Sequence, residues 1–132
     1  MMDHRIHADE PARGGGLNVL FVTGNADLRA VATRVLGREG HEVVTAAHSG
    51  HALLAGLECE RIDILISEVQ LDGVTGEWVA ASLRRYHLGM RALYMADAGA
   101  PARAGVLVRP FTRDDLMREI ETICRVISPA AS

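Results

Sequence analysis

Short aliphatic segments alternate with helix-like patterns along most of this chain. The segment at residues 62–67 is dominated by Ile and Leu, which is typical of a strand that is buried on both faces. Strands of that kind lie in parallel sheets, because the crossover connections between parallel strands place helices on both sides. The sequence therefore predicts an α/β fold around a parallel sheet.

Four further strands and four helices complete the predicted alternation. The other strands are expected at Asn18–Val22, 42–45, 92–95 and Val106–Val108. Asp27 is a candidate N-cap for the first helix, and Gly40 is a candidate stop. Thr112 and Asp115 resemble a capping box at the start of the last helix. The helices follow from apolar residues at helical spacing: Leu28, Val31, Ala32, Val35 and Leu36; Ala52, Leu53 and Leu57; Val79 and Leu83; and Leu116, Ile120, Ile123, Cys124 and Ile127.

The 132 residues are enough for one domain with its own core. Residues 1–16 are polar and end in three glycines, so we expect a disordered N-terminal arm. The ordered domain should span residues 17–127. Residues 128–132 are small and polar and should form a frayed C-terminus.

Composition excludes several classes of protein. The net charge is only −3, which gives no field to attract nucleic acid, and no apolar run approaches the roughly 20 residues of a membrane span. All 14 basic residues are arginine, which excludes any mechanism that needs a lysine. Cys59 and Cys124 are too few for a disulfide framework. We expect a cytoplasmic protein with two reduced thiols on opposite faces of the sheet.

Three stretches together resemble the receiver domains of bacterial two-component response regulators. They are VLFVTGNADLRAVATRVLGREGHEVVTA, DILISEVQLDGVTG, and VRPF followed by TRDDL. The resemblance covers residues 17–127. It implies a flavodoxin-like (CheY-like), doubly wound sheet of five parallel strands in the order 2-1-3-4-5, with helices one and five on one face. It also places the chemistry at the carboxyl ends of the strands.

Receiver domains transfer a phosphoryl group to an Asp on strand three, with Mg²⁺ held by an acidic pair after strand one. A hydroxyl after strand four and a Lys after strand five bind the phosphoryl oxygens, and an aromatic on strand five takes part in switching. Each of these residue types is replaced here. The equivalent positions are Thr23 and Gly24 for the acidic pair, Glu68 for the phosphoacceptor, Ala96 for the hydroxyl, Val106 for the aromatic and Arg109 for the lysine.

The family's fourth helix has little room in this chain. Only 13 positions separate Ala96 from Arg109, and the intervening DAGAPARAG is a poor helix former. We expect this helix to be shortened or missing.

Glu68 has two interpretations that remain open at this point. It is either a partial mimic of a phosphorylated Asp, or a structural carboxylate paired with Arg109. Both interpretations predict the same contact, because an arginine can bind a carboxylate through two nitrogens.

The resemblance and its losses predict a pseudo-receiver. It should be a phosphorylation-independent interaction module with no enzymatic activity, no cofactor and no metal. Its partner should be a histidine kinase or another signalling protein, and a homodimer stays open. Trp78 lies beside the apolar stripe of its helix and is a candidate partner contact or a residue lying flat on its own surface. The alternative function is a nucleotide or anion sensor, which would need a polar cavity near Thr23, Glu68 and Arg109.

Overall fold

The computed structural model describes residues 16–101 and 103–131. Five parallel strands form one sheet in the order β2-β1-β3-β4-β5, as predicted. Their bounds are β1 Asn18–Val22, β2 Glu42–Ala46, β3 Ile64–Glu68, β4 Arg91–Ala96 and β5 Val106–Val108. Parallel pairing throughout places all five carboxyl ends at one edge of the sheet.

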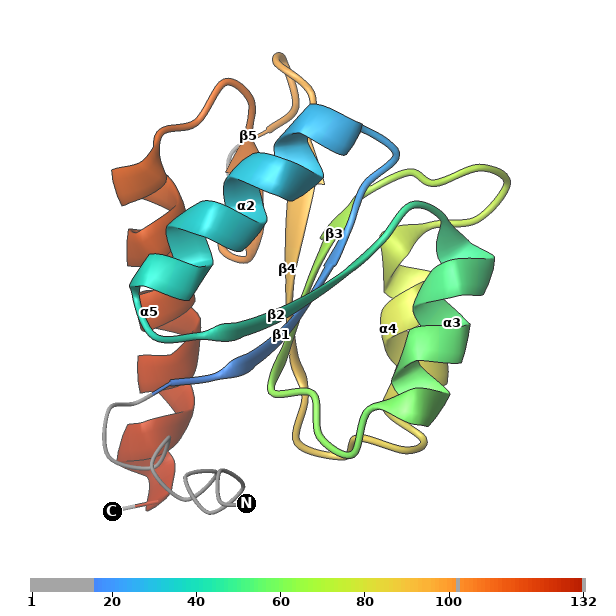
Figure 1. Ribbon diagram of the computed structural model, residues 1–132. Coiled ribbons are helices and arrows are strands. Elements are labelled where there is room, and N and C mark those ends of the chain that lie inside the picture. The colour runs from blue at the N-terminus through green and yellow to red at the C-terminus, as the bar shows by residue number, and fades with distance from the viewer. Residues whose placement is uncertain (1–15, 102, 132) are drawn as a thin grey trace.

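Four helices cover the sheet from both sides (Figure 1). Helices α2 (Ala26–Arg38) and α5 (Arg113–Ala131) lie on one face, and α3 (Ser49–Glu58) and α4 (Gly76–Leu83) lie on the other. The first and last helices therefore share a face, as predicted. We call these surfaces the α2/α5 face and the α3/α4 face.

The helix ends correct one prediction and support two others. The N-cap of α2 is Asn25, whose side chain accepts a hydrogen bond from the backbone of Leu28, so the predicted cap Asp27 lies instead in the first turn. Gly40 follows α2 with φ of +92°, a conformation that favours glycine. Thr112 and Asp115 bond reciprocally between side chain and backbone, which is the predicted capping box.

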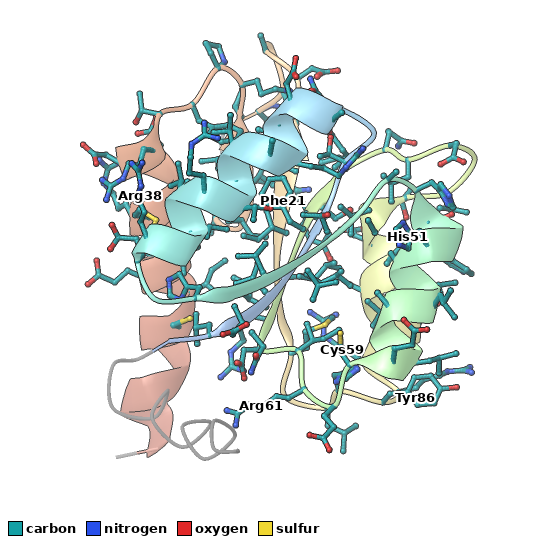
Figure 2. All side chains as sticks on the ribbon, viewed as in Figure 1. Phe21, Arg38, His51, Cys59, Arg61 and Tyr86 are labelled. Carbon is teal, nitrogen blue, oxygen red and sulfur yellow. The ribbon has the colours of Figure 1, made fainter. Side chains whose placement is uncertain are left out.

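Apolar residues of all five strands lie beneath α2 and α5. The strands contribute Val19, Phe21, Val43, Ile64, Ile66, Leu93, Met95 and Leu107, and the helices contribute Ala32, Leu36, Leu116 and Ile120. Figure 2 shows Phe21 in the interior, between α2 and the strands. This face forms a continuous core from one edge of the sheet to the other.

The core on the α3/α4 face is less extensive. It contains Leu20, Val22, Ala46 and Leu65 of the strands, packed against Ala52, Ala55, Val79, Ala80 and Leu83 of the helices. It reaches β4 only through the half-buried Ala92 and Tyr94, and among the described residues it includes none from β5. Cys59 packs against this core and Cys124 against the other, so the two free thiols lie on opposite faces as predicted.

The family's fourth helix is missing. The described residues between β4 and β5 form turns, with positive φ at Gly99 and Gly105. The prediction of a shortened or missing helix is therefore confirmed.

The predicted arm at residues 1–16 lies outside the described residues except for Gly16. At the other end, α5 continues to Ala131, beyond the domain limit expected at residue 127. In the parts of the chain that the structure describes, no helix combines the length and the apolar character needed to cross a membrane.

Candidate functional site

The carboxyl edge of the sheet brings together most of the positions predicted from the sequence. Thr23 follows β1, Glu68 ends β3, Ala96 ends β4 and Arg109 follows β5. Strand register aligns these ends, since Ala96 pairs with Val108, the residue before Arg109. The backbone N–H of Arg109 also donates to the carbonyl of Ala96 at 2.8 Å, which fixes where the arginine leaves the sheet.

Arg109 binds the carboxylate of Glu68 through two nitrogens. Its Nη2 lies 2.6 Å from Oε1 and its Nη1 lies 3.3 Å from Oε2. The side chain of Glu68 is only 16% exposed and that of Arg109 is 30% exposed. The hydrogen bond that Arg109 donates to Glu68 raises the pKa of Arg109, against the opposing effect of partial burial. This is the contact that the sequence predicts, and it is a charge-assisted, bidentate pair.

Thr23 provides a second bond to the same carboxylate. Its hydroxyl donates to Oε2 of Glu68 at 2.6 Å, and its side chain is fully buried. Thr23 is itself held by its backbone, because its N–H donates to Ala46 at 3.1 Å and its carbonyl accepts from Arg29 at 2.9 Å. Both oxygens of Glu68 are therefore engaged by neighbouring side chains.

Asp97 joins the group from the loop after β4. Its Oδ1 accepts from Nη2 of Arg109 at 2.9 Å, but its side chain is 90% exposed. Sequence analysis does not assign Asp97 to this ion pair, nor Thr23 to a bond with Glu68. The only sequence signal for either is proximity in sequence to a strand end. We expect the exposed Asp97 contact to contribute well under 1 kcal/mol, since solvent screens it.

The residues here do not fit the Mg²⁺ ion that the family uses. Thr23 and Gly24 supply no carboxylate where the acidic pair would be. Glu68 and Asp97 both accept from the Arg109 guanidinium, whose positive charge lies where a cation would bind. Among the described residues, no group of three or more His, Cys, Asp or Glu side chains could hold a metal ion.

Two switch-equivalent positions also carry residues without the required groups. The methyl group of Ala96 is buried and has no oxygen to offer a ligand. Val106 has no ring, and its strand β5 is only three residues long. The arrangement therefore holds Glu68 in one bonded position, and Ala96 has no hydroxyl with which to bind a phosphoryl oxygen.

Trp78 and the His48–His51 pair lie outside this group. Trp78 is on α4 and is 48% exposed. His48 is the N-cap of α3, where its Nδ1 accepts a hydrogen bond from the backbone of His51 at 3.1 Å. Sequence analysis does not identify this cap. Figure 2 shows His51 on α3, on the side of the molecule that carries α3 and α4.

A hollow of about 400 Å³ lies at the opposite end of the sheet, before the starts of β3 and β4. Arg61 and Tyr86, both labelled in Figure 2, line it together with Glu60, Asp63 and Arg91. Its two carboxylates balance its two guanidinium groups, and Arg61 already pairs with Asp63 at 2.8 Å. It is separate from the Glu68 site and offers no net charge to an anion.

Solved receiver domains share this architecture. The receiver domain of the hybrid histidine kinase CckA is 31% identical, and the match covers 80% of this chain and 96% of that domain with a TM-score of 0.65. A response regulator receiver domain protein from Clostridium thermocellum is 20% identical, with a TM-score of 0.73 over 86% of this chain and 98% of that one.

Curated relatives are longer proteins. The transcriptional regulatory protein TcrA of Mycobacterium tuberculosis is 30% identical over 122 residues, which are 86% of this chain and 48% of TcrA. The transcriptional regulatory protein GlrR of Escherichia coli is 31% identical over 104 residues, or 72% of this chain and 23% of GlrR. This chain thus spans about half of TcrA and about a quarter of GlrR. No protein-family model matches it.

Proposed function

Since this chain belongs to the receiver-domain family of two-component signal transduction, we propose that it is a receiver that binds another protein without being phosphorylated. The observation that carries this proposal is the bidentate pair between Arg109 and Glu68. It occupies the place at which receivers perform their chemistry, and it engages Glu68, the carboxylate at the position equivalent to the phosphoacceptor.

Three features argue against phosphoryl transfer. Both oxygens of Glu68 accept hydrogen bonds, so a nucleophilic attack must first break a partly buried ion pair. The residues around it do not fit Mg²⁺, so no metal ion would offset the repulsion between the carboxylate and an incoming phosphoryl group. Ala96 supplies no hydroxyl for that group. The domain is therefore a binding module, with no enzymatic activity, cofactor or metal.

The expected partner is a cytoplasmic signalling protein, such as a histidine kinase. A net charge of −3 gives the chain no overall positive field to attract nucleic acid. Trp78 is a candidate anchor, because a half-exposed Trp offers a large apolar area to a partner. A homodimer is the alternative assembly.

The sensor alternative has less support. A nucleotide or anion at this edge would have to displace the Arg109–Glu68 pair or bind beside it, and Glu68 and Asp97 would both repel it.

The first test is exposure to Mg²⁺ with acetyl phosphate or beryllium fluoride, followed by amide NMR. We expect an unchanged spectrum. The matched control restores the family residues together as Thr23→Asp, Gly24→Asp, Glu68→Asp, Ala96→Thr and Arg109→Lys, and it should show Mg²⁺-dependent shifts around position 68. Such shifts in the unaltered protein would overturn the proposal.

Glu68→Ala separates the two roles of the carboxylate. If Glu68 mimics a phosphorylated Asp, partner affinity falls while the melting temperature holds. If Glu68 is a structural partner of Arg109, the unfolding free energy drops by about 1–3 kcal/mol, because a partly buried guanidinium loses its acceptor. Partner affinity then falls only in proportion to the fraction of protein that is unfolded. Asp97→Ala is the control and should change neither quantity appreciably. No change at all in Glu68→Ala would reject both roles.

A further inference from the structure

The missing helix leaves part of the sheet incompletely covered. On the α3/α4 face, Leu65 of β3 is fully buried, but Ala92 and Tyr94 of β4 remain partly exposed. Leu107 packs into the opposite core, so its neighbours Val106 and Val108 point toward the α3/α4 face, and both are also partly exposed. These four residues, Ala92, Tyr94, Val106 and Val108, form what we call the β4–β5 floor.

The loop that replaces the helix has nothing large with which to cover this floor. Its described residues between Asp97 and Gly105 are Ala, Gly and Pro apart from Arg103, which is exposed. A parallel sheet normally has helices over its whole surface. The floor is therefore an apolar strip whose covering helix is absent from the described chain.

One side of α4 borders the β4–β5 floor. Glu77, Ala81 and Arg84 follow one another at helical spacing, and all three are exposed. Burial raises the pKa of Tyr94, Glu77 adds to that rise, and Arg84 opposes it. Contacts place both ends of this side of α4 beside β4. A Cβ on Gly76 would lie 3.1 Å from the ring of Tyr94, and Nε of Arg84 donates at 3.2 Å to the carbonyl of Met90, the residue before β4. The small side chain of Ala81 between these two ends allows a close approach.

The strip has opposite charges at its two ends. Glu77 is in the first turn of α4, near the carboxyl edge, because its neighbour Gly76 lies beside the backbone of Glu68 at the end of β3. Arg84 is the C-cap of α4, toward the other edge. A helix carries partial positive charge at its N-terminus and partial negative charge at its C-terminus. A helix with its N-terminus beside Glu77 and its C-terminus beside Arg84 would match both ends.

Shape favours a helix over a strand as the occupant. A helix about 10 Å across spans two strands that are about 4.8 Å apart. The open edge of β5 has only three residues, which is too short to pair securely with an added strand.

From this charge pattern and floor we propose that an amphipathic α-helix of a partner protein binds on β4 and β5, antiparallel to the strands. This inference rests on the proposed function and specifies its interaction surface. The partner helix presents an apolar stripe to Tyr94, Val106 and Val108. Its first turn lies beside Glu77 and its last turn beside Arg84, so that it takes the position of the missing helix.

The test places a photo-crosslinking amino acid at single positions of the full chain, expressed in its native cell. Position 106 probes the floor, positions 77 and 84 probe the two ends, and Val44 is the control, a valine of the other edge strand that is 41% exposed. Mass spectrometry then identifies the residues that are crosslinked.

We expect positions 106, 77 and 84 to crosslink to one segment of another protein, with apolar residues at helical spacing. Position 77 should reach the N-terminal end of that segment and position 84 its C-terminal end, and position 44 should not reach it. The inference would be overturned if position 106 crosslinked to a second copy of this chain or to its own residues 1–15, or if it formed no crosslink. It would also be overturned if position 77 reached the C-terminal end of the captured segment and position 84 its N-terminal end.

A substitution gives an independent measurement on the captured segment, prepared as a peptide. Val106→Glu should weaken its binding about tenfold or more, because a carboxylate would face an apolar stripe. Val44→Glu should leave affinity within about twofold. Equal effects of the two substitutions would overturn the inference. A fifth probe at position 78 separates this inference from the proposed function, because capture there without capture at position 106 would leave the proposed function standing and remove only this surface.

Discussion

The two faces of the sheet differ in how far their helices reach. On the α2/α5 face, side chains from all five strands lie in one core, and Leu107 of β5 is among them. On the α3/α4 face the core stops at Ala92 and Tyr94 of β4. The comparison shows that the chain retains the complete half of the receiver fold and has lost the helix on the other half, next to the positions that would switch.

In the proposed pseudo-receiver, that loss would coincide with the loss of the moving parts. Ala96 and Val106 would stand in place of the hydroxyl and the aromatic that move when a receiver is phosphorylated, and no helix lies among the described residues between β4 and β5. A switch needs two arrangements of comparable energy. Since Arg109 and Thr23 already hold Glu68, we expect the free protein to keep one conformation at this edge.

The largest expected effect compares two neighbours on β5. Leu107→Ala removes a buried side chain from the α2/α5 core and should cost about 2–5 kcal/mol of unfolding free energy. Val106→Ala removes a partly exposed side chain from the other face and should cost less than about 1 kcal/mol. Urea denaturation of both variants measures the difference. A cost for Val106→Ala that equals that of Leu107→Ala would mean that the α3/α4 face is also closed over β5.

A second pair tests whether α4 is packed firmly beside the incompletely covered strip. A Cβ on Gly76 would lie 2.4 Å from the carbonyl oxygen of Glu68 and 3.1 Å from the ring of Tyr94. Because the first of these atoms is backbone, Gly76→Ala should cost about 1–3 kcal/mol.

Gly37→Ala is the matched control on the other face. Nothing lies within 4 Å of a Cβ added at Gly37 in α2, so this change should stabilise the protein by about 0.5–1 kcal/mol. Thermal melts of the two variants should therefore shift in opposite directions. A neutral Gly76→Ala would indicate that α4 can move away from β3 and Tyr94.

The sequence predicts the strands and the contact between Glu68 and Arg109 because neither depends on the exact course of a loop. Strands Asn18–Val22 and Val106–Val108 have the predicted bounds, and Glu68 meets Arg109 because parallel strand ends converge. The missing helix follows from the short spacing between Ala96 and Arg109 and from the composition between them. Periodicity predicts the individual strands, whereas the strand order and the equivalent site positions come from the resemblance to receiver domains.

The contacts that sequence analysis misses depend on side-chain direction at loops. Asn25 rather than Asp27 caps α2, because its Oδ1 reaches the N–H of Leu28. The hydroxyl of Thr23 turns toward Glu68, and Asp97 turns toward Arg109. No periodic pattern encodes such orientations, since each depends on where one or two loop residues leave a strand.

The smallest expected effect concerns His41, at the margin of the α2/α5 face. Its Nδ1 accepts a hydrogen bond at 3.0 Å from the N–H of Leu17, a residue that packs against that core. Burial lowers the pKa of His41 below 6.5, and Glu39 opposes this effect. Because the folded pKa is depressed, the stabilising contribution is complete above the unfolded pKa and is lost as the pH falls through the folded pKa. Protonation would also place a hydrogen on the accepting nitrogen.

Urea denaturation at pH 7.5 and pH 5.5 tests this contribution against His41→Asn, whose Oδ1 can accept the same bond but does not titrate. The wild-type protein should lose a few tenths of a kcal/mol more than the variant between these two pH values, since solvent screens a half-exposed imidazole. The other histidines are present in both proteins, so their titration cancels in the difference. An identical pH dependence would show that protonation of His41 does not change stability in this range, so that the fold does not depend on the bond to Leu17. The edge of the α2/α5 face would then depend on apolar packing alone.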